Sequence, residues 1–189
     1  MTSQPAPRSA YSMGSWPNML RSLLVIGLMV AGLVAIVPRI SQVERPAVDA
    51  VSKASYVAKQ PGWQVELPAG LGSDWVPTVA SLAPGTEEVL TFTTVWTTPS
   101  GGDIALKEAA GVTPGWVERS VNGGAAGGEV AIDGRAWQRY AAAERGQVSY
   151  VLRGAGTGGK ALTLVATGVV SDDELKALVA ALDPVVPAS

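Results

Sequence analysis

The sequence predicts an α+β protein: a mostly antiparallel β-sheet covered by two helices and preceded by one transmembrane helix. Three observations support this fold class. An apolar run without any charge lies near the N-terminus, at residues 22–37. After it, apolar and polar residues alternate in short runs between turn residues, which is typical of half-buried strands. Two later segments begin with helix-capping residues, at Thr113 and at Ser171.

The first element is the apolar segment at residues 19–38, which is long enough to cross a bilayer. A spanning helix takes about 20 mostly apolar residues, and Arg21 near one end can extend its charge to the headgroups. The alternative is a cleavable signal peptide, but its apolar core is about 7–15 residues long and a small-x-small cleavage site follows it. The run here is longer and no such site follows. We therefore expect a membrane anchor, preceded by a disordered cytoplasmic tail at residues 1–18.

Basic residues flank the anchor on both sides. Arg8 and Arg21 precede the apolar run, whereas Arg39 and Arg45 follow it and are partly offset by Glu44. Because cytoplasmic flanks carry the excess of Lys and Arg, this count favours, by a small margin, an N-terminus inside the cell. We therefore expect a single-pass protein of the cell membrane whose C-terminal domain is extracytoplasmic.

The segment at residues 39–60 is predicted to be a juxtamembrane tether. Its apolar residues are loosely spaced, which allows a short helix, and Pro61-Gly62 is a turn signal that ends it. One extracytoplasmic α+β domain is then expected at residues 61–184, followed by a tail at residues 185–189.

Seven strands and two helices are expected in this domain. The clearest strand is 89–97, where apolar residues alternate with threonines. Asp133-Gly134 lies between two alternating runs and is typical of a two-residue hairpin turn. The order of three strands, a helix, four strands and a helix predicts an α+β sandwich. The strands are expected at 75–79, 89–97, 103–108, 129–132, 135–140, 147–153 and 161–170, and the helices at 114–121 and 171–182.

The composition excludes several classes of function. The chain has neither Cys nor His, which removes disulfides, thiol nucleophiles, a lipobox cysteine, the commonest general base and the commonest transition-metal ligand. The part after Val37 holds 12 Lys and Arg against 16 Asp and Glu, a net charge of −4, so it gives no electrostatic reason to bind nucleic acid. We expect no enzymatic activity, no catalytic residue, no metal and no cofactor.

The remaining polar motifs have structural interpretations. Glu87 and Glu88 are adjacent before a strand, where neighbouring side chains point to opposite faces, so we interpret them as a solvated loop end. A Ser–Lys dyad would need Ser81 or Ser149 beside Lys107 or Lys160, and nothing in the sequence brings these residues together.

Five tryptophans of the predicted domain are the residues from which a binding site would be built. Their first interpretation is the core of a small sandwich, because each ring buries about 150–250 Å². In the alternative, two or three of them line a groove for a lipid, glycan or peptide. Trp63 and Trp116 are expected to be the most exposed. Arg135 and Arg139 share the strand face of Trp137, and the sequence fits equally a guanidinium that stacks on the indole and a solvated sheet face. The candidate ligand-binding residues are Trp63, Trp116, Trp137, Arg135 and Arg139.

Short motifs stand in a characteristic order along the chain. They are Pro38-Arg39, Arg45-Pro46-Ala47-Val48-Asp49, Gly72-Ser73-Asp74-Trp75, Trp96-Thr97-Thr98-Pro99 with Gly101, Ile132 to Gln138, and Thr167-Gly168 through Ser171, Glu174 and Leu175. In order and spacing, these motifs resemble the DUF4245 family of actinobacterial membrane proteins of unknown function, with Ala47 as an insertion. The resemblance implies a membrane-anchored extracytoplasmic domain with no assigned activity. The order of strands and helices also resembles the Mog1/PsbP-like sandwich, which bears on the fold alone.

Two functions follow from these observations. The first is a non-catalytic, membrane-anchored protein of the cell envelope that acts as an interaction or accessory module. Its partners would be the lipid bilayer and an envelope protein, and not nucleic acid. The alternative is an extracytoplasmic ligand-binding domain with a tryptophan-lined groove for a lipid, glycan or peptide.

Overall fold

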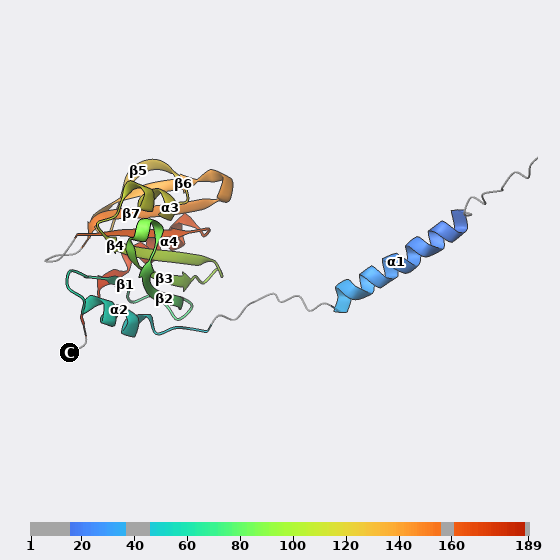
Figure 1. The fold of residues 1–189 in the computed structure, drawn as a ribbon, viewed down its shortest axis with the longest axis horizontal. Coiled ribbons are helices and arrows are strands. Elements are labelled where there is room, and N and C mark those ends of the chain that lie inside the picture. The colour runs from blue at the N-terminus through green and yellow to red at the C-terminus, as the bar shows by residue number, and fades with distance from the viewer. Residues whose placement is uncertain (1–15, 37–45, 156–160, 188–189) are drawn as a thin grey trace, which may run out of the picture. The chain divides into compact units, whose positions relative to one another are not determined.

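The structure is a computed structural model that describes residues 16–36, 46–155 and 161–187 (Figure 1). The chain divides into two compact units, Met1–Glu44 and Arg45–Ser189, which we describe separately. Most of the predicted disordered tail, the first part of the predicted tether and the last two residues of the predicted C-terminal tail lie outside the described residues.

The first unit contains α1, Trp16–Ile36, a helix of 21 residues. At roughly 1.5 Å per residue it rises about 30 Å, which matches the hydrocarbon core of a bilayer. Its apolar side chains are exposed, with Leu23 at 70% and Met29 at 69%. Among the described residues it is the one helix long and apolar enough to cross a membrane. The predicted apolar helix is confirmed, and it begins at Trp16 rather than at Met19.

The second unit is built on a seven-stranded sheet of order β2-β3-β4-β8-β7-β6-β5, in which every neighbouring pair is antiparallel. Figure 1 shows β5 at one edge of this sheet and β2 at the other. The predicted α+β class with a mostly antiparallel sheet is confirmed. The strands are β2 (Val76–Pro84), β3 (Leu90–Thr97), β4 (Asp103–Ala110), β5 (Ala125–Ile132), β6 (Arg135–Ala142), β7 (Gln147–Ala155) and β8 (Leu162–Gly168).

Two very short strands escaped the sequence analysis. β1 (Glu66–Pro68) and β9 (Leu182–Pro184) form a separate antiparallel pair. Three residues are too few to show an alternating pattern, and each strand ends in a proline, which argues against a strand.

Three helices and two single-turn 3₁₀ helices complete the second unit. Thr113 caps α3 by accepting a hydrogen bond from the Trp116 backbone N–H, at 3.0 Å. Ser171 and Glu174 form a complete capping box at the start of α4, as the sequence predicts. The helices are α2 (Ala50–Ala58), α3 (Pro114–Ser120), α4 (Asp172–Ala180), η1 (Thr86–Glu88) and η2 (Ala143–Arg145).

Helices cover both faces of the sheet. Neighbouring residues of β7 belong to different cores, Tyr150 to the larger one and Val151 to the smaller one, so the two cores lie on opposite faces. α2, α4 and the β1–β9 pair contribute to the larger core, and α3 contributes to the smaller one. The two predicted helices, at α3 and α4, therefore lie on opposite faces of the sheet.

The second half of the predicted tether, residues 39–60, is part of the folded domain. α2 begins after Asp49, whose side chain accepts the Ser52 backbone N–H at 2.8 Å. Its inward residues Ala50, Ala54 and Val57 are all buried in the larger core. The prediction of a tether is wrong for this helix because its buried residues are small, so their packing leaves a weak apolar signal in the sequence.

A buried polar network crosses the larger core. Glu108 on β4 is fully buried and accepts the backbone N–H of Glu66 at 2.9 Å. The Glu66 carboxylate accepts from Arg135 on β6 at 2.5 Å, and the other end of that guanidinium donates to the carbonyls of Val179 at 3.3 Å and Leu182 at 3.5 Å. The network thus joins β4, β1, β6, α4 and β9.

Burial raises the pKa of Glu108 well above its ordinary value of 4.5, and the nearby Glu66 carboxylate raises it further. The hydrogen bond from the Glu66 backbone opposes this shift without cancelling it. Because the neutral form is favoured in the folded state, protonation of Glu108 stabilises the fold fully below pH 4.5. That contribution is lost as the pH rises through the raised pKa of the folded state.

We predict that residues 46–189 fold on their own, whereas a fragment of residues 61–189 is destabilised. Removing α2 uncovers the core beneath Ala50, Ala54 and Val57, at a cost on the order of 3 kcal/mol. Thermal unfolding of both fragments, followed by circular dichroism, checks this. Equal unfolding midpoints would contradict the assignment of α2 to the core.

We also predict that Glu108→Gln stabilises the fold at pH 8 by on the order of 1 kcal/mol and changes little at pH 4. The amide resembles the neutral acid but cannot become a buried charge. Urea unfolding at pH 4, 6 and 8 measures the effect, with exposed Glu118→Gln as the matched control. If both variants keep the pH dependence of the unmodified chain, Glu108 is not its source.

Candidate functional site

The tryptophans expected to line a groove are packed in two separate cores. Trp116 is only 2% exposed, and its indole N–H donates to the Thr91 hydroxyl at 3.0 Å. Trp137 is completely buried in the larger core, on the opposite face of the sheet. The expectation that Trp116 is exposed is wrong, because the helix that carries it turns this residue and Val117 toward the sheet.

The other predicted site residues lie on the α4 side and are used within the fold. Trp63 is half-buried and packs against the same core as Trp137. The guanidinium of Arg135 lies 5.5 Å from the centre of the Trp137 ring, which is the stacked one of the two arrangements that the sequence left open, and it also binds Glu66. Arg139 pairs with Asp172 at 3.5 Å. The structure thus brings four of the five residues to one face and separates Trp116 from them.

A Ser–Lys dyad within the described residues would pair Ser81 or Ser149 with Lys107, since Lys160 lies outside them. Lys107 is in register with Thr93 and Val165 on the neighbouring strands. Ser81 and Ser149 each lie two strands away from β4, about 10 Å, so neither forms a dyad with Lys107. Within the part of the chain that the structure describes, no group of three or more acidic residues is placed to hold a metal ion.

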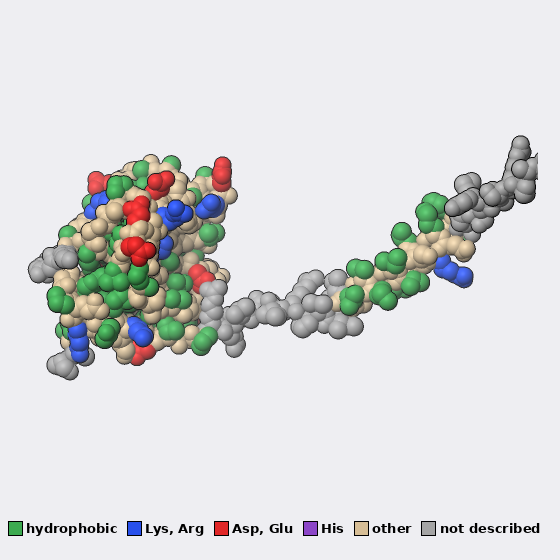
Figure 2. Space-filling model, viewed as in Figure 1, with side chains coloured by type: hydrophobic (Ala, Val, Ile, Leu, Met, Phe, Trp, Pro, Cys, Tyr) green, Lys and Arg blue, Asp and Glu red, His purple; other side chains and the backbone are tan. Residues whose placement is uncertain are grey.

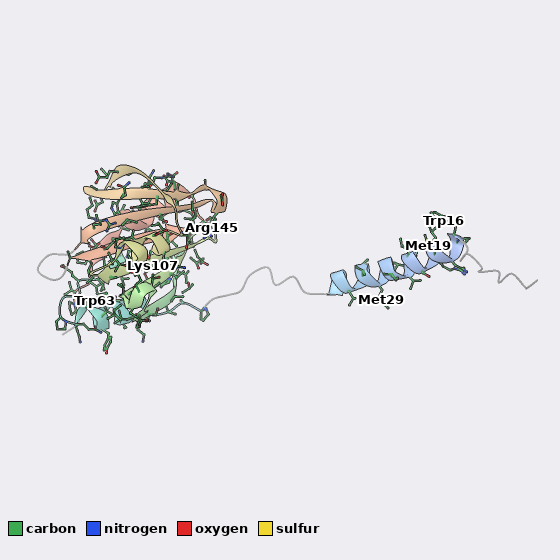
Figure 3. All side chains as sticks on the ribbon, turned by 45° about the horizontal axis from the view of Figure 1, so that its top comes forward. Trp16, Met19, Met29, Trp63, Lys107 and Arg145 are labelled. Atoms are coloured by element: carbon green, nitrogen blue, oxygen red, sulfur yellow. The ribbon has the colours of Figure 1, made fainter. Side chains whose placement is uncertain are left out.

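The strongest candidate site is a groove of about 470 Å³ along the outer side of α3, which we call the α3 groove. Segments far apart in the sequence meet there: the β2–β3 turn, α3, the residues after α3, and the β6–β7 turn. Figure 3 shows Arg145 on the β6–β7 turn, at the edge of the domain. The groove is lined by Thr86, Glu87, Gly115, Glu118, Arg119, Asn122, Gly123 and Arg145.

Backbone strain is concentrated at one end of the α3 groove. Four residues other than glycine have positive φ among the described residues. Asp133 lies in the Asp-Gly hairpin turn, and Asn122 follows the end of α3, and both positions commonly adopt this conformation. Glu87 and Glu88, both with φ of 57°, are the central residues of the β2–β3 hairpin turn, in which the Val89 backbone N–H donates to the Thr86 carbonyl at 3.2 Å. Hairpin turns of this kind favour Gly, Asn or Asp at these positions, and here both are glutamate. A left-handed conformation costs each of them about 1–2 kcal/mol.

The strained turn places the Glu87 carboxylate against the start of α3. A Cβ at Gly115 would lie 2.1 Å from the Glu87 Oε1 atom, so the carboxylate rests directly on the glycine backbone. The sequence predicts a solvated loop end at Glu87 and Glu88 and does not predict this arrangement. Two consecutive glutamates give no sign of left-handed backbone, and nothing in the sequence pairs Glu87 with a glycine in α3.

The charged side chains of the α3 groove are not used within the fold. Glu87, Glu118, Arg119 and Arg145 are exposed and have no ion pair or side-chain hydrogen bond within the described residues. Two carboxylates and two guanidiniums therefore face solvent around one hollow. Figure 2 shows acidic and basic side chains intermixed on this face of the domain.

A second groove lies between α2 and β2, with a volume of about 480 Å³. Its walls include Tyr56, Leu82 and Phe92, and Lys53 is its one charged residue. None of its lining residues has positive φ. Since neither strain nor a set of free charges marks this groove, we regard the α3 groove as the better candidate.

Comparisons with known proteins found one match. A family model described as "Protein of unknown function (DUF4245)" matches residues 12–182, which include α1 and most of the second unit. No curated protein and no solved structure matches the chain.

We predict that Glu88→Gly stabilises the domain by about 1 kcal/mol, because glycine adopts positive φ without the steric cost. The Glu88 side chain is exposed, so its removal sacrifices no packing. Urea unfolding of the full chain measures the change. Glu88→Ala is the control, since it removes the charge and keeps the strain. Equal effects of the two substitutions would show that the charge, rather than the backbone, determines stability at this turn.

Proposed function

The chain belongs to the DUF4245 family of proteins of unknown function, and on that premise we propose that it is a membrane-anchored, non-catalytic protein of the cell envelope. Its N-terminus is cytoplasmic, its domain is extracytoplasmic, and it acts as an interaction module that binds an envelope protein through the α3 groove.

The anchor supports the membrane part of the proposal. α1 exposes apolar side chains over most of its length, and Arg21 is its one charge. Such a surface is unfavourable in water and favourable in lipid. The basic residues that flank α1 support the orientation by the positive-inside rule.

The observation that carries the interaction is the α3 groove itself. Exposed charges without partners are common on protein surfaces, but they seldom coincide with a pair of strained residues. Strained backbone persists where the surrounding structure holds it, and it is concentrated at functional sites. Here it positions the Glu87 carboxylate at the wall of the groove.

The charges of the groove indicate the kind of partner. Glu87 and Glu118 balance Arg119 and Arg145, so the groove attracts neither a polyanion nor a polycation. A protein surface presents both signs of charge at fixed positions and can match such a pattern. The alternative of a tryptophan-lined ligand groove loses its support, since Trp116 and Trp137 lie in separate cores.

Photo-crosslinking in intact cells tests this function. A photo-reactive residue at Glu118, inside the groove, is expected to give one discrete adduct with an envelope protein. The same residue at exposed Lys59 on the α2 side is the control and is expected to give none. Arg145→Glu is expected to reduce the adduct about tenfold, because it reverses one charge of the pattern. The proposal would be contradicted if Arg145→Glu left the amount of adduct unchanged, or if the photo-reactive residue gave equal amounts of adduct at positions 118 and 59.

The absence of cysteine allows the orientation to be checked in the same cells. Val186→Cys, at a position that is 83% exposed, is expected to react with a membrane-impermeant maleimide before lysis. Ser9→Cys is expected to react only after lysis. The reverse pattern would place the domain in the cytoplasm and overturn the proposal.

A further inference from the structure

β5 is the accessible edge of the seven-stranded sheet. Within the described residues it pairs with β6 alone, so one side of its backbone has no neighbouring strand there. The opposite edge, β2, is protected: Pro77 and Pro84 lie near its ends, and the Pro77 carbonyl accepts the Val48 backbone N–H at 2.9 Å. Prolines are a common protection of sheet edges, and β5 has none.

The surface of β5 presents backbone rather than side chains. Its first four residues, Ala-Ala-Gly-Gly, are exposed and carry nothing larger than a methyl group. After an irregularity between Ala126 and Glu129, the ladder with β6 is regular up to Ile132. In a two-residue hairpin the residue pair next to the turn, here Ile132 and Arg135, is hydrogen-bonded. Hydrogen-bonded and non-hydrogen-bonded pairs alternate along an antiparallel ladder, so the N–H and C=O groups of Ala131 and Glu129 point away from β6.

The β5 edge leads directly to the α3 groove. Asn122 and Gly123 line the groove, and β5 begins two residues later, at Ala125. The free guanidiniums of Arg119 and Arg145 lie at this same end of the strand. A chain that runs along the edge toward Ala125 therefore reaches two cations that the domain does not use.

From this continuity we infer that the partner binds by strand addition: an extended segment of another polypeptide pairs with β5 and places a carboxylate between Arg119 and Arg145. Backbone hydrogen bonds hold the segment, and the guanidiniums fix its register. A second copy of this chain fits less well. Antiparallel pairing of two β5 edges centred on Ala131 sets Glu129 of one copy opposite Asp133 of the other, and β5 carries no basic residue to offset them. The inference rests on the proposed function and names its partner class.

The test uses the full chain in lipid nanodiscs and a displayed library of random decapeptides as the probe. Selected peptides are expected to carry Asp or Glu at one end and β-branched residues in the body. On binding, the amides of Glu129 and Ala131 are expected to gain protection from hydrogen exchange. Binding by the selected peptides is expected to weaken about tenfold in Arg145→Glu and in Ala131→Pro, which removes an outward N–H.

Two controls keep the outcome decisive. Circular dichroism tests whether the Ala131→Pro variant is folded. If it is unfolded, the hydrogen-exchange measurement on the unmodified chain is the test of strand addition. Glu144→Gln, on the same turn as Arg145 but outside the groove lining, is expected to bind normally. A library that yields no acidic-ended peptide, or peptides that leave the β5 amides unprotected, overturns strand addition. If the Glu118 crosslink still forms, only this inference fails; if it is also absent, the proposed function fails with it.

Discussion

The guanidinium of Arg135 is the contact on which the arrangement of the second unit depends. From its place on β6 it reaches the Glu66 carboxylate on β1, the Val179 carbonyl in the last turn of α4 and the carbonyl of Leu182, the first residue of β9. A buried ion pair gains little net energy, because both charges give up water. The contribution of Arg135 here is to geometry. The end of a helix leaves backbone carbonyls without donors, and the planar guanidinium has several N–H groups that can bind to them.

This contact also determines where the domain begins. Glu66 is held at two points, by Arg135 through its carboxylate and by Glu108 through its backbone N–H. The chain before β1 is therefore fixed against the sheet, and α2 packs into the same core. The folded domain therefore includes α2, and the α3 face remains free of this network.

The elements that could be predicted from the sequence are those with a strong local sequence pattern. The seven main strands, the hairpin at Asp133-Gly134 and the capped helix after Ser171 were predictable, because alternation, turn residues and capping boxes are local patterns. α2 was not, since its buried face is mostly alanine. The site was less predictable still. Trp116 points inward because of how α3 packs, and the α3 groove combines residues from four separate segments with a strained turn that has no sequence pattern.

The unequal size of the two cores has a consequence for the dynamics of the domain. Among the described residues, the apolar core on the α3 side has six buried members, against 21 in the core on the side of α2 and α4. Partial opening takes the lowest free-energy route, which is the layer that buries least. α3 and its flanking turns are thus the part expected to detach first while the opposite layer stays folded. A partner that restrains this layer reduces its conformational entropy on binding, so affinity depends on the rigidity of α3 as well as on the contacts made.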